Sequence, residues 1–109
     1  MYNSTFARQS SGRLNQYLLK EIMEATPKQL IIKVYDIAIV SCKKQDFMRA
    51  NNAIQVLINS LRFEGEGVKE ISTGLLRLYL FCQEQTRKKN FELATRILSE
   101  LRDTWLKVL

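Results

Sequence analysis

The stretch ATPKQLIIKVYDIAIV, residues 25–40, decides the fold of this chain. Its first residues are a strong start signal for a helix: Thr26 can cap unpaired backbone amides, Pro27 suits the first helical position, and Gln29 can reach back as in a capping box. The apolar residues that follow recur at helical spacing. The stretch therefore predicts a helix that continues to about residue 44.

This helix is more apolar than the core of a small helical domain requires. Between residues 30 and 40 only Lys33 and Asp36 are polar. The apolar side chains cover an arc of roughly 220°, whereas a core needs a stripe of about 100°. We therefore expect apolar surface to remain after the core has formed.

The N-terminal part of the chain carries a weaker helical pattern. Residues 1–12 are polar and Ser-rich, and we expect them to form a flexible arm. Leu14, Leu18 and Ile22 follow at a spacing of four, which predicts a short amphipathic helix over residues 13–25.

Capping and turn residues divide the rest of the chain into three more helices. Asp46 is predicted to cap a helix that ends near residue 62, and a Gly-rich loop follows over residues 63–67. A further helix is predicted over residues 68–88, and Asn90 is expected to cap a last helix that continues to the C-terminus.

The short connections near residues 44–46 and 88–90 force neighbouring helices to run antiparallel. The sequence therefore predicts an all-α fold: an antiparallel four-helix bundle with a short extra N-terminal helix and a flexible arm. At 109 residues the chain can bury roughly 65% of its unfolded surface, so residues 13–109 are expected to form one domain around one core.

Composition argues against an enzyme. The chain has no His, so imidazole catalysis and His-bearing zinc sites are excluded, and its two cysteines cannot furnish a metal cage. The acidic residues show no metal-ligand spacing, and no phosphate-binding glycine loop occurs. We expect no cofactor, no metal and no catalytic residues.

The net charge of +6 allows an anionic partner, although a solvated basic surface explains it equally simply. No stretch approaches the roughly 20 apolar residues that cross a bilayer, and residues 1–12 contain no apolar segment of the kind found in signal peptides. The sequence therefore predicts a cytosolic protein that does not bind a membrane.

Apolar surface is also left over on the helices predicted at 46–62 and 68–88. Val56 on the first, and Leu76 and Leu80 on the second, lie to one side of the core stripe. The last predicted helix carries a single narrow stripe of apolar residues, which the core accounts for. The N-terminal helix could cover this surplus, or the surplus could form a groove for a partner segment.

Several motifs together resemble those of one family. Tyr17, ATPKQL at residues 25–30 and VYD at 34–36 resemble the Tyr…A-S/T-P-x-x-L…L-Y-D signature of FliS, the flagellin-specific export chaperone. IQVLINSL at 54–61 is similar to the family's A-Q-x-I-I-x-x-L pattern. The segments LY at 78–79 and LRDTW at 101–105 are similar to the family's L-Y and L/F-R-D-A-W segments. Ile37 departs from the family, which usually has Gly there, and both helical hairpins are shorter.

The resemblance implies a cytosolic chaperone that binds the disordered C-terminal segment of flagellin in hydrophobic surface grooves. It would prevent premature polymerisation and deliver flagellin to a component of the flagellar export gate. Asp36 is expected to orient a neighbouring helix or the arm. The residues expected to contact the segment are Tyr17, Ile32, Tyr35, Ile39, Ala53, Val56, Leu76 and Leu80.

Two other functions stay open at this point. One is a small basic helical protein that binds nucleic acid, which the apolar central helices disfavour because a recognition helix needs polar and basic side chains. The other is an adaptor that uses the same apolar surface to form a weak homodimer.

Overall fold

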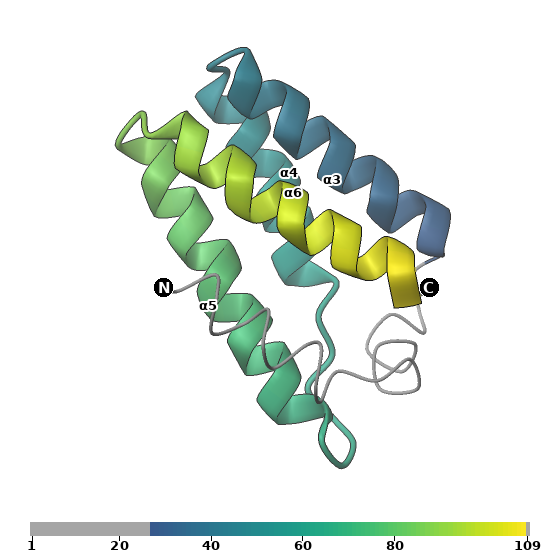
Figure 1. Cartoon of the computed structure of the whole chain (residues 1–109). Coiled ribbons are helices and arrows are strands. Elements are labelled where there is room, and N and C mark those ends of the chain that lie inside the picture. The colour runs from purple at the N-terminus through teal and green to yellow at the C-terminus, as the bar shows by residue number, and fades with distance from the viewer. Residues whose placement is uncertain (1–26, 109) are drawn as a thin grey trace.

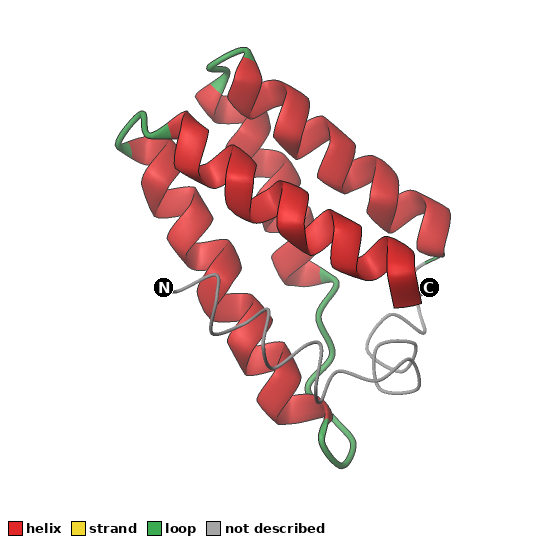
Figure 2. Ribbon diagram, in the orientation of Figure 1, coloured by secondary structure: helices red, strands yellow, loops and turns green. Residues whose placement is uncertain are grey.

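The computed structural model describes residues 27–108, and the side chains of residues 27–107. This part of the chain is all-helical, with four helices and no strand (Figures 1 and 2). The helices are α3 (Lys28–Lys43), α4 (Phe47–Asn59), α5 (Val68–Arg87) and α6 (Phe91–Val108). The expected arm, the N-terminal helix and Thr26 lie outside the described residues.

The first described helix begins one residue later than the sequence predicted. Pro27 has an extended ψ of 140° and precedes α3, so Lys28, and not Pro27, takes the first helical position. The Pro27 carbonyl accepts hydrogen bonds from the backbone amides of Leu30 (3.1 Å) and Ile31 (3.2 Å). Proline is compatible with this place because it supplies the carbonyl and needs no amide partner.

Two short turns of the same design end α3 and α5. Gln45 and Lys89 adopt left-handed φ angles of 59° and 66°. The amides of Gln45 and Asp46 donate to Cys42 and Ser41, and those of Lys89 and Asn90 donate to Thr86 and Gln85. This is the Schellman pattern of helix termination. Both turns lie at the same end of the molecule in Figure 1.

The cap predicted at Asp46 is confirmed, because its side chain accepts the backbone amide of Arg49 at 3.2 Å. The predicted end of α4 near residue 62 is wrong by three residues. The Ser60 hydroxyl donates to the Leu57 carbonyl at 2.8 Å and competes with continuation of the helix. The loop therefore fills residues 60–67 and ends at Gly67, whose φ of 81° favours glycine.

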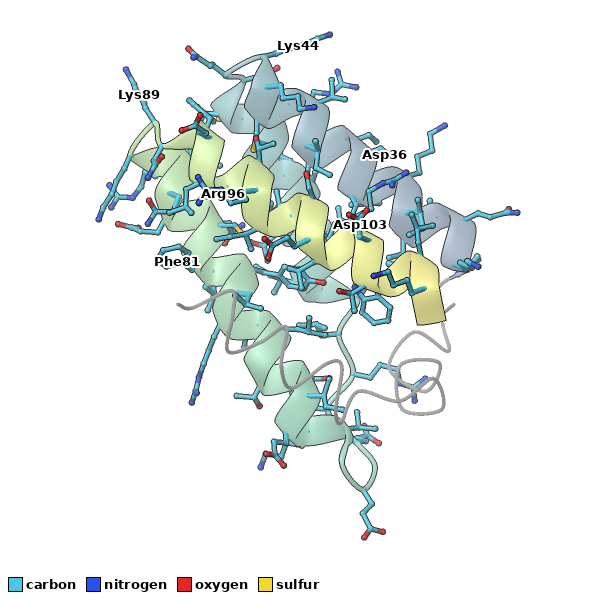
Figure 3. All side chains as sticks on the ribbon, in the orientation of Figure 1. Asp36, Lys44, Phe81, Lys89, Arg96 and Asp103 are labelled. Atoms are coloured by element: carbon cyan, nitrogen blue, oxygen red, sulfur yellow. The ribbon has the colours of Figure 1, made fainter. Side chains whose placement is uncertain are left out.

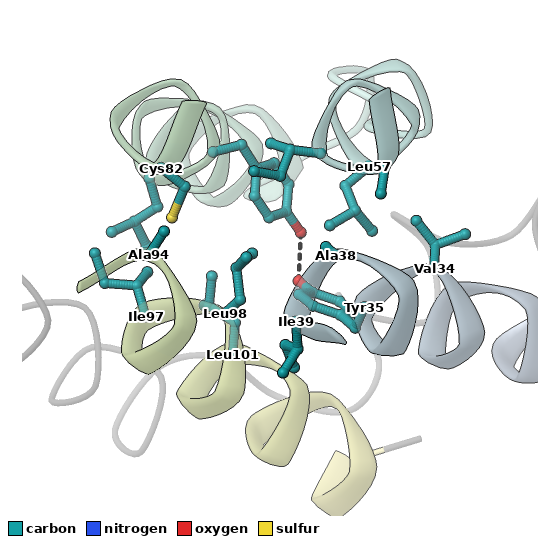
Figure 4. Close-up of a cluster of buried hydrophobic side chains, with 14 of the residues drawn as sticks. Val34, Tyr35, Ala38, Ile39, Leu57, Cys82, Ala94, Ile97, Leu98 and Leu101 are labelled. Carbon is teal, nitrogen blue, oxygen red and sulfur yellow. Dashed lines mark hydrogen bonds between the residues drawn. The ribbon is translucent and has the colours of Figure 1, made fainter. Parts of the chain in front are cut away.

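The four helices enclose one hydrophobic core. α3 and α5 each pack against both α4 and α6. Figure 4 shows the centre of the core, where side chains from all four helices meet. The most buried large side chains include Tyr35, Ile54, Leu57, Tyr79 and Leu98. Full burial of each such aliphatic side chain contributes about 1.5–3 kcal/mol.

A hydrogen-bonded aromatic trio lies inside this core. The hydroxyls of Tyr35 and Tyr79 are 2.5 Å apart, and Trp105 Nε1 donates to the Tyr35 hydroxyl at 2.8 Å. Burial raises the pKa of Tyr79 to about 12 and that of Tyr35 well above its ordinary value. The trio ties α3, α5 and α6 together with every polar atom paired, as a buried network requires.

None of the helices described for this chain is both long and apolar enough to cross a membrane.

Candidate peptide-binding surfaces

A groove of about 660 Å³ follows the outer face of α3. Eight of its lining residues recur along α3 at helical spacing, and the turn after α3, the start of α4 and the end of α6 complete its walls. Because α3 has 16 residues, the groove extends over about 24 Å at 1.5 Å per residue. We call this the α3 groove; it is lined by Lys28, Gln29, Ile32, Lys33, Asp36, Ile37, Val40, Ser41, Lys44, Asp46, Arg49 and Leu106.

The floor of the α3 groove is apolar. Ile32 and Ile37 are partly buried and pack against the core, while Val40 is 47% exposed and Leu106 of α6 is 43% exposed. Leu30, at the start of the helix, is also exposed. The surplus of apolar surface predicted for this helix is therefore confirmed, and Ile32 is the proposed contact residue that lies in the groove.

Asp36 lies in the groove but is bound to a neighbouring helix. Its Oδ1 atom is 2.5 Å from Nε of Arg102, which is half-buried on α6. The ion pair joins the middle of α3 to the last turns of α6. The prediction that Asp36 orients an adjacent helix is confirmed by this contact.

A second apolar surface lies where α4 meets α5. Gln83 Nε2 donates to Gln55 Oε1 at 3.1 Å, so the two helices lie side by side there. Val56 of α4 is 49% exposed, but it follows Gln55 directly and therefore points about 100° away from it. Leu80 lies one turn before Gln83, on the same side of α5, and is 50% exposed. Leu76 lies one turn before Leu80 and is half-buried. We call Leu76 and Leu80 the α4–α5 seam; these two residues and Val56 were predicted as contact residues.

Three of the predicted contact residues are wrong as surface residues, because they are buried in the core. The Tyr35 side chain is fully enclosed, and its hydroxyl bonds to Tyr79 and Trp105 and does not reach the surface. Ile39 and Ala53 are also buried, on the faces of α3 and α4 that pack inward. Tyr17 lies outside the described residues.

Sequence reasoning missed Val40, Ile37 and Leu106 as groove residues. Val40 and Ile37 fall in the broad apolar arc of α3, where every apolar residue looks equivalent. Leu106 follows the core residue Trp105 and therefore points about 100° away from it. That offset from the narrow core stripe of α6 is the signal that could have identified it.

The surfaces carry no evident reactive group. Cys42 and Cys82 are free and buried, and burial raises the pKa of Cys42 to about 11 and that of Cys82 still further, so both thiols stay protonated at neutral pH. Among residues 27–108 no group of acidic or sulfur side chains could hold a metal ion. What the arrangement offers is apolar surface for binding.

Comparisons of the chain with protein-family models, with curated proteins and with solved structures find no match in any of the three. The function is therefore inferred from the chain's own residues and their geometry.

Proposed function

We propose that this protein is a non-enzymatic chaperone that binds the disordered C-terminal segment of flagellin. It would keep that segment from polymerising early and deliver it to the flagellar export gate in the cytosol. The observation that carries the proposal is the apolar surface left outside the core, in the α3 groove and at the α4–α5 seam. The motif resemblance to FliS supplies the identity of the segment.

Two separate apolar surfaces suit a disordered client better than a compact one. A segment that orders as it binds loses conformational entropy, so its affinity must come from a large buried area. The α3 groove and the α4–α5 seam lie on different helices, and an extended segment can reach both. Isoleucine, valine and leucine side chains each contribute about 1.5–3 kcal/mol when they become fully buried.

The proposal includes the finer architecture expected from the sequence. The helices would form an antiparallel four-helix bundle, and the short helix at residues 13–25 would pack beside it, with Tyr17 competing with the client or clamping it. A component of the export gate would be the second partner.

The experiment compares surface variants by titration calorimetry with a flagellin C-terminal peptide. Leu80→Asp and Val56→Asp should each weaken binding at least about tenfold, because each places a charge on half-exposed apolar surface. Met48→Asp is the matched control, since Met48 is 65% exposed, lies on α4 and lines neither surface. Unchanged affinity in the folded Leu80→Asp protein would remove the α4–α5 seam from the site, and unchanged affinity in the folded Val56→Asp protein would remove the exposed side of α4.

A nucleic-acid-binding function has one observation in its favour. Lys44 and Lys89 lie at the same end of the molecule, where Lys43, Arg87 and Lys88 end their helices (Figure 3). Cations at helix C-termini complement the helix dipole, which gives them a structural role. Binding to nucleic acid would weaken steeply with salt, whereas binding in an apolar groove would change little. Light scattering with and without the peptide separates both from a homodimeric adaptor.

A further inference from the structure

The α3 groove is rimmed by positive charge. Lys28 and Lys33 line it from α3, Lys44 lines it from the turn that follows α3, and Arg49 lines it from the start of α4. None of these four forms an ion pair with any residue that the structure describes. The cations are spread along the whole length of the groove, since Lys28 and Lys44 stand at its two ends.

The two carboxylates in the groove are already engaged. Asp36 forms its ion pair with Arg102, and Asp46 accepts the backbone amide of Arg49 at the N-terminus of α4, where negative charge is favourable. Arg102 offsets the charge of Asp36, whereas Asp46 keeps its negative charge, so the groove lining carries four cations against one carboxylate whose charge no described cation offsets. An occupant meets an apolar floor of Ile32, Ile37, Val40 and Leu106 between unpaired cations.

We infer that the α3 groove binds an acidic amphipathic helix contributed by another protein. Its apolar face would lie on the groove floor, and Glu or Asp side chains along both edges of that face would meet the lysines and Arg49. The length of the groove matches about 16 helical residues. This inference rests on the proposed function only in using the groove as a peptide site, and it names the chemistry of the segment that fits.

Charge argues against two other occupants. Residues 1–26 carry three basic and two acidic side chains, so the chain's own N-terminal segment lacks the net negative charge that would pair with the cations of the groove rim. A second copy of the chain carries a net charge of +6 and would repel the rim. Nucleic acid would satisfy the cations but leave the apolar floor without a partner.

The test uses two labelled helical peptides of about 16 residues with the same Leu and Ile face, one with Glu along both edges and the other with Lys. Fluorescence anisotropy with the full chain should show that the acidic peptide binds at least about tenfold more tightly in about 0.05 M salt. The difference should shrink in about 0.5 M salt, because the rim is exposed to solvent.

A pair of charge-reversal variants locates the effect. Lys33→Glu/Arg49→Glu should weaken binding of the acidic peptide at least about tenfold. The protein should stay folded, because both side chains are exposed and a Glu at position 49 completes a capping box with Asp46. Lys69→Glu/Arg96→Glu is the matched control: it makes the same charge change at exposed positions on α5 and α6 that do not line the groove, and should change the affinity less than about twofold.

Four results would overturn the inference: equal affinity for the two peptides, equal weakening by the groove and control variants, displacement of the acidic peptide by a peptide of residues 13–25, or displacement by single-stranded DNA. A flagellin C-terminal peptide is titrated in parallel. If it fails to bind while the acidic peptide binds with the expected dependence on Lys33 and Arg49, the flagellin proposal falls and the groove inference stands. If flagellin binds but the charge preference is missing, the reverse holds.

Discussion

The Tyr35 hydroxyl of α3 lies 2.5 Å from the Tyr79 hydroxyl of α5 inside the core, and it also accepts the indole N–H of Trp105. Tyr35 therefore makes both of these hydrogen bonds, and Trp105 lies close enough to interact with the Tyr79 hydroxyl as well. The position of Tyr35 fixes which face of the strongly apolar helix α3 turns inward, and consequently which face is left to form the α3 groove.

Removing the Tyr35 hydroxyl should destabilise the protein more than removing the Tyr79 hydroxyl. Tyr35→Phe removes the hydroxyl that pairs with both the Trp105 N–H and the Tyr79 hydroxyl, and we expect a loss of about 2–4 kcal/mol in the free energy of unfolding. Tyr79→Phe leaves the Trp105–Tyr35 bond intact, with an expected loss of about 1–2 kcal/mol. Urea denaturation measures both, and equal losses would show that the trio does not act as a chain centred on Tyr35.

The protein should lose stability in alkaline solution. In the folded state burial raises the pKa of both tyrosines, while in the unfolded chain each titrates near 10. Above pH 10 the unfolded state therefore binds fewer protons than the folded state at both tyrosines. The buried thiols of Cys42 and Cys82, whose pKa values are also raised, add the same effect from about pH 9. The free energy of unfolding should therefore begin to decrease near pH 9 and decrease more steeply above pH 10, by up to about 1.4 kcal/mol per pH unit for each group. Urea titrations from pH 8 to beyond pH 11 would test this, and Tyr79→Phe should reduce the slope; a flat profile would contradict the burial of the hydroxyls.

Glycine at either left-handed turn position should stabilise the protein. Gln45 and Lys89 have positive φ angles that are strained for residues with a Cβ atom. Gln45→Gly and Lys89→Gly should each raise the free energy of unfolding by about 0.5–1 kcal/mol. Lys44→Gly serves as the control, because its φ of −87° offers glycine no advantage and the substitution should be destabilising. Thermal denaturation distinguishes the two outcomes.

The ion pair between Asp36 and Arg102 should matter more for the charge of the groove than for stability. Both side chains are partly exposed, so Arg102→Ala should lower the free energy of unfolding by about 1 kcal/mol or less. It should nevertheless weaken binding of the acidic peptide several-fold, because the Asp36 carboxylate then faces the peptide without the guanidinium that offsets its charge. Adding Asp36→Asn to Arg102→Ala should restore the affinity. Lack of rescue would mean that Asp36 does not face the occupant.

Much of the fold could be predicted because its signals are local. Asp46 caps its helix as expected, and the narrow apolar stripe predicted for the last helix faces the core, where Ala94, Leu98 and Trp105 are buried. The end of α4 could not be placed because it depends on the Ser60 hydroxyl taking the Leu57 carbonyl. The spacing of the apolar residues carries no information about whether the Ser60 hydroxyl makes this hydrogen bond.

The candidate surfaces were predictable only where apolar residues stand apart from a stripe. Val56 and Leu80 do so, and both are exposed. On α3 the apolar arc is so wide that Tyr35 and Val40 could exchange inward and outward roles without changing the pattern. Only the contacts of Tyr35 with Tyr79 and Trp105, made across the core, decide between the two orientations.

The most direct measurement of the central claim is titration calorimetry of the full chain with a flagellin C-terminal segment at several temperatures. Burial of apolar surface in the α3 groove and at the α4–α5 seam predicts saturable binding with a clearly negative heat-capacity change. A variant that carries both Val40→Asp and Leu80→Asp should abolish that binding, while Met48→Asp should retain it. The absence of binding by the unmodified chain at every temperature, or binding that survives in the folded double variant, would contradict the account.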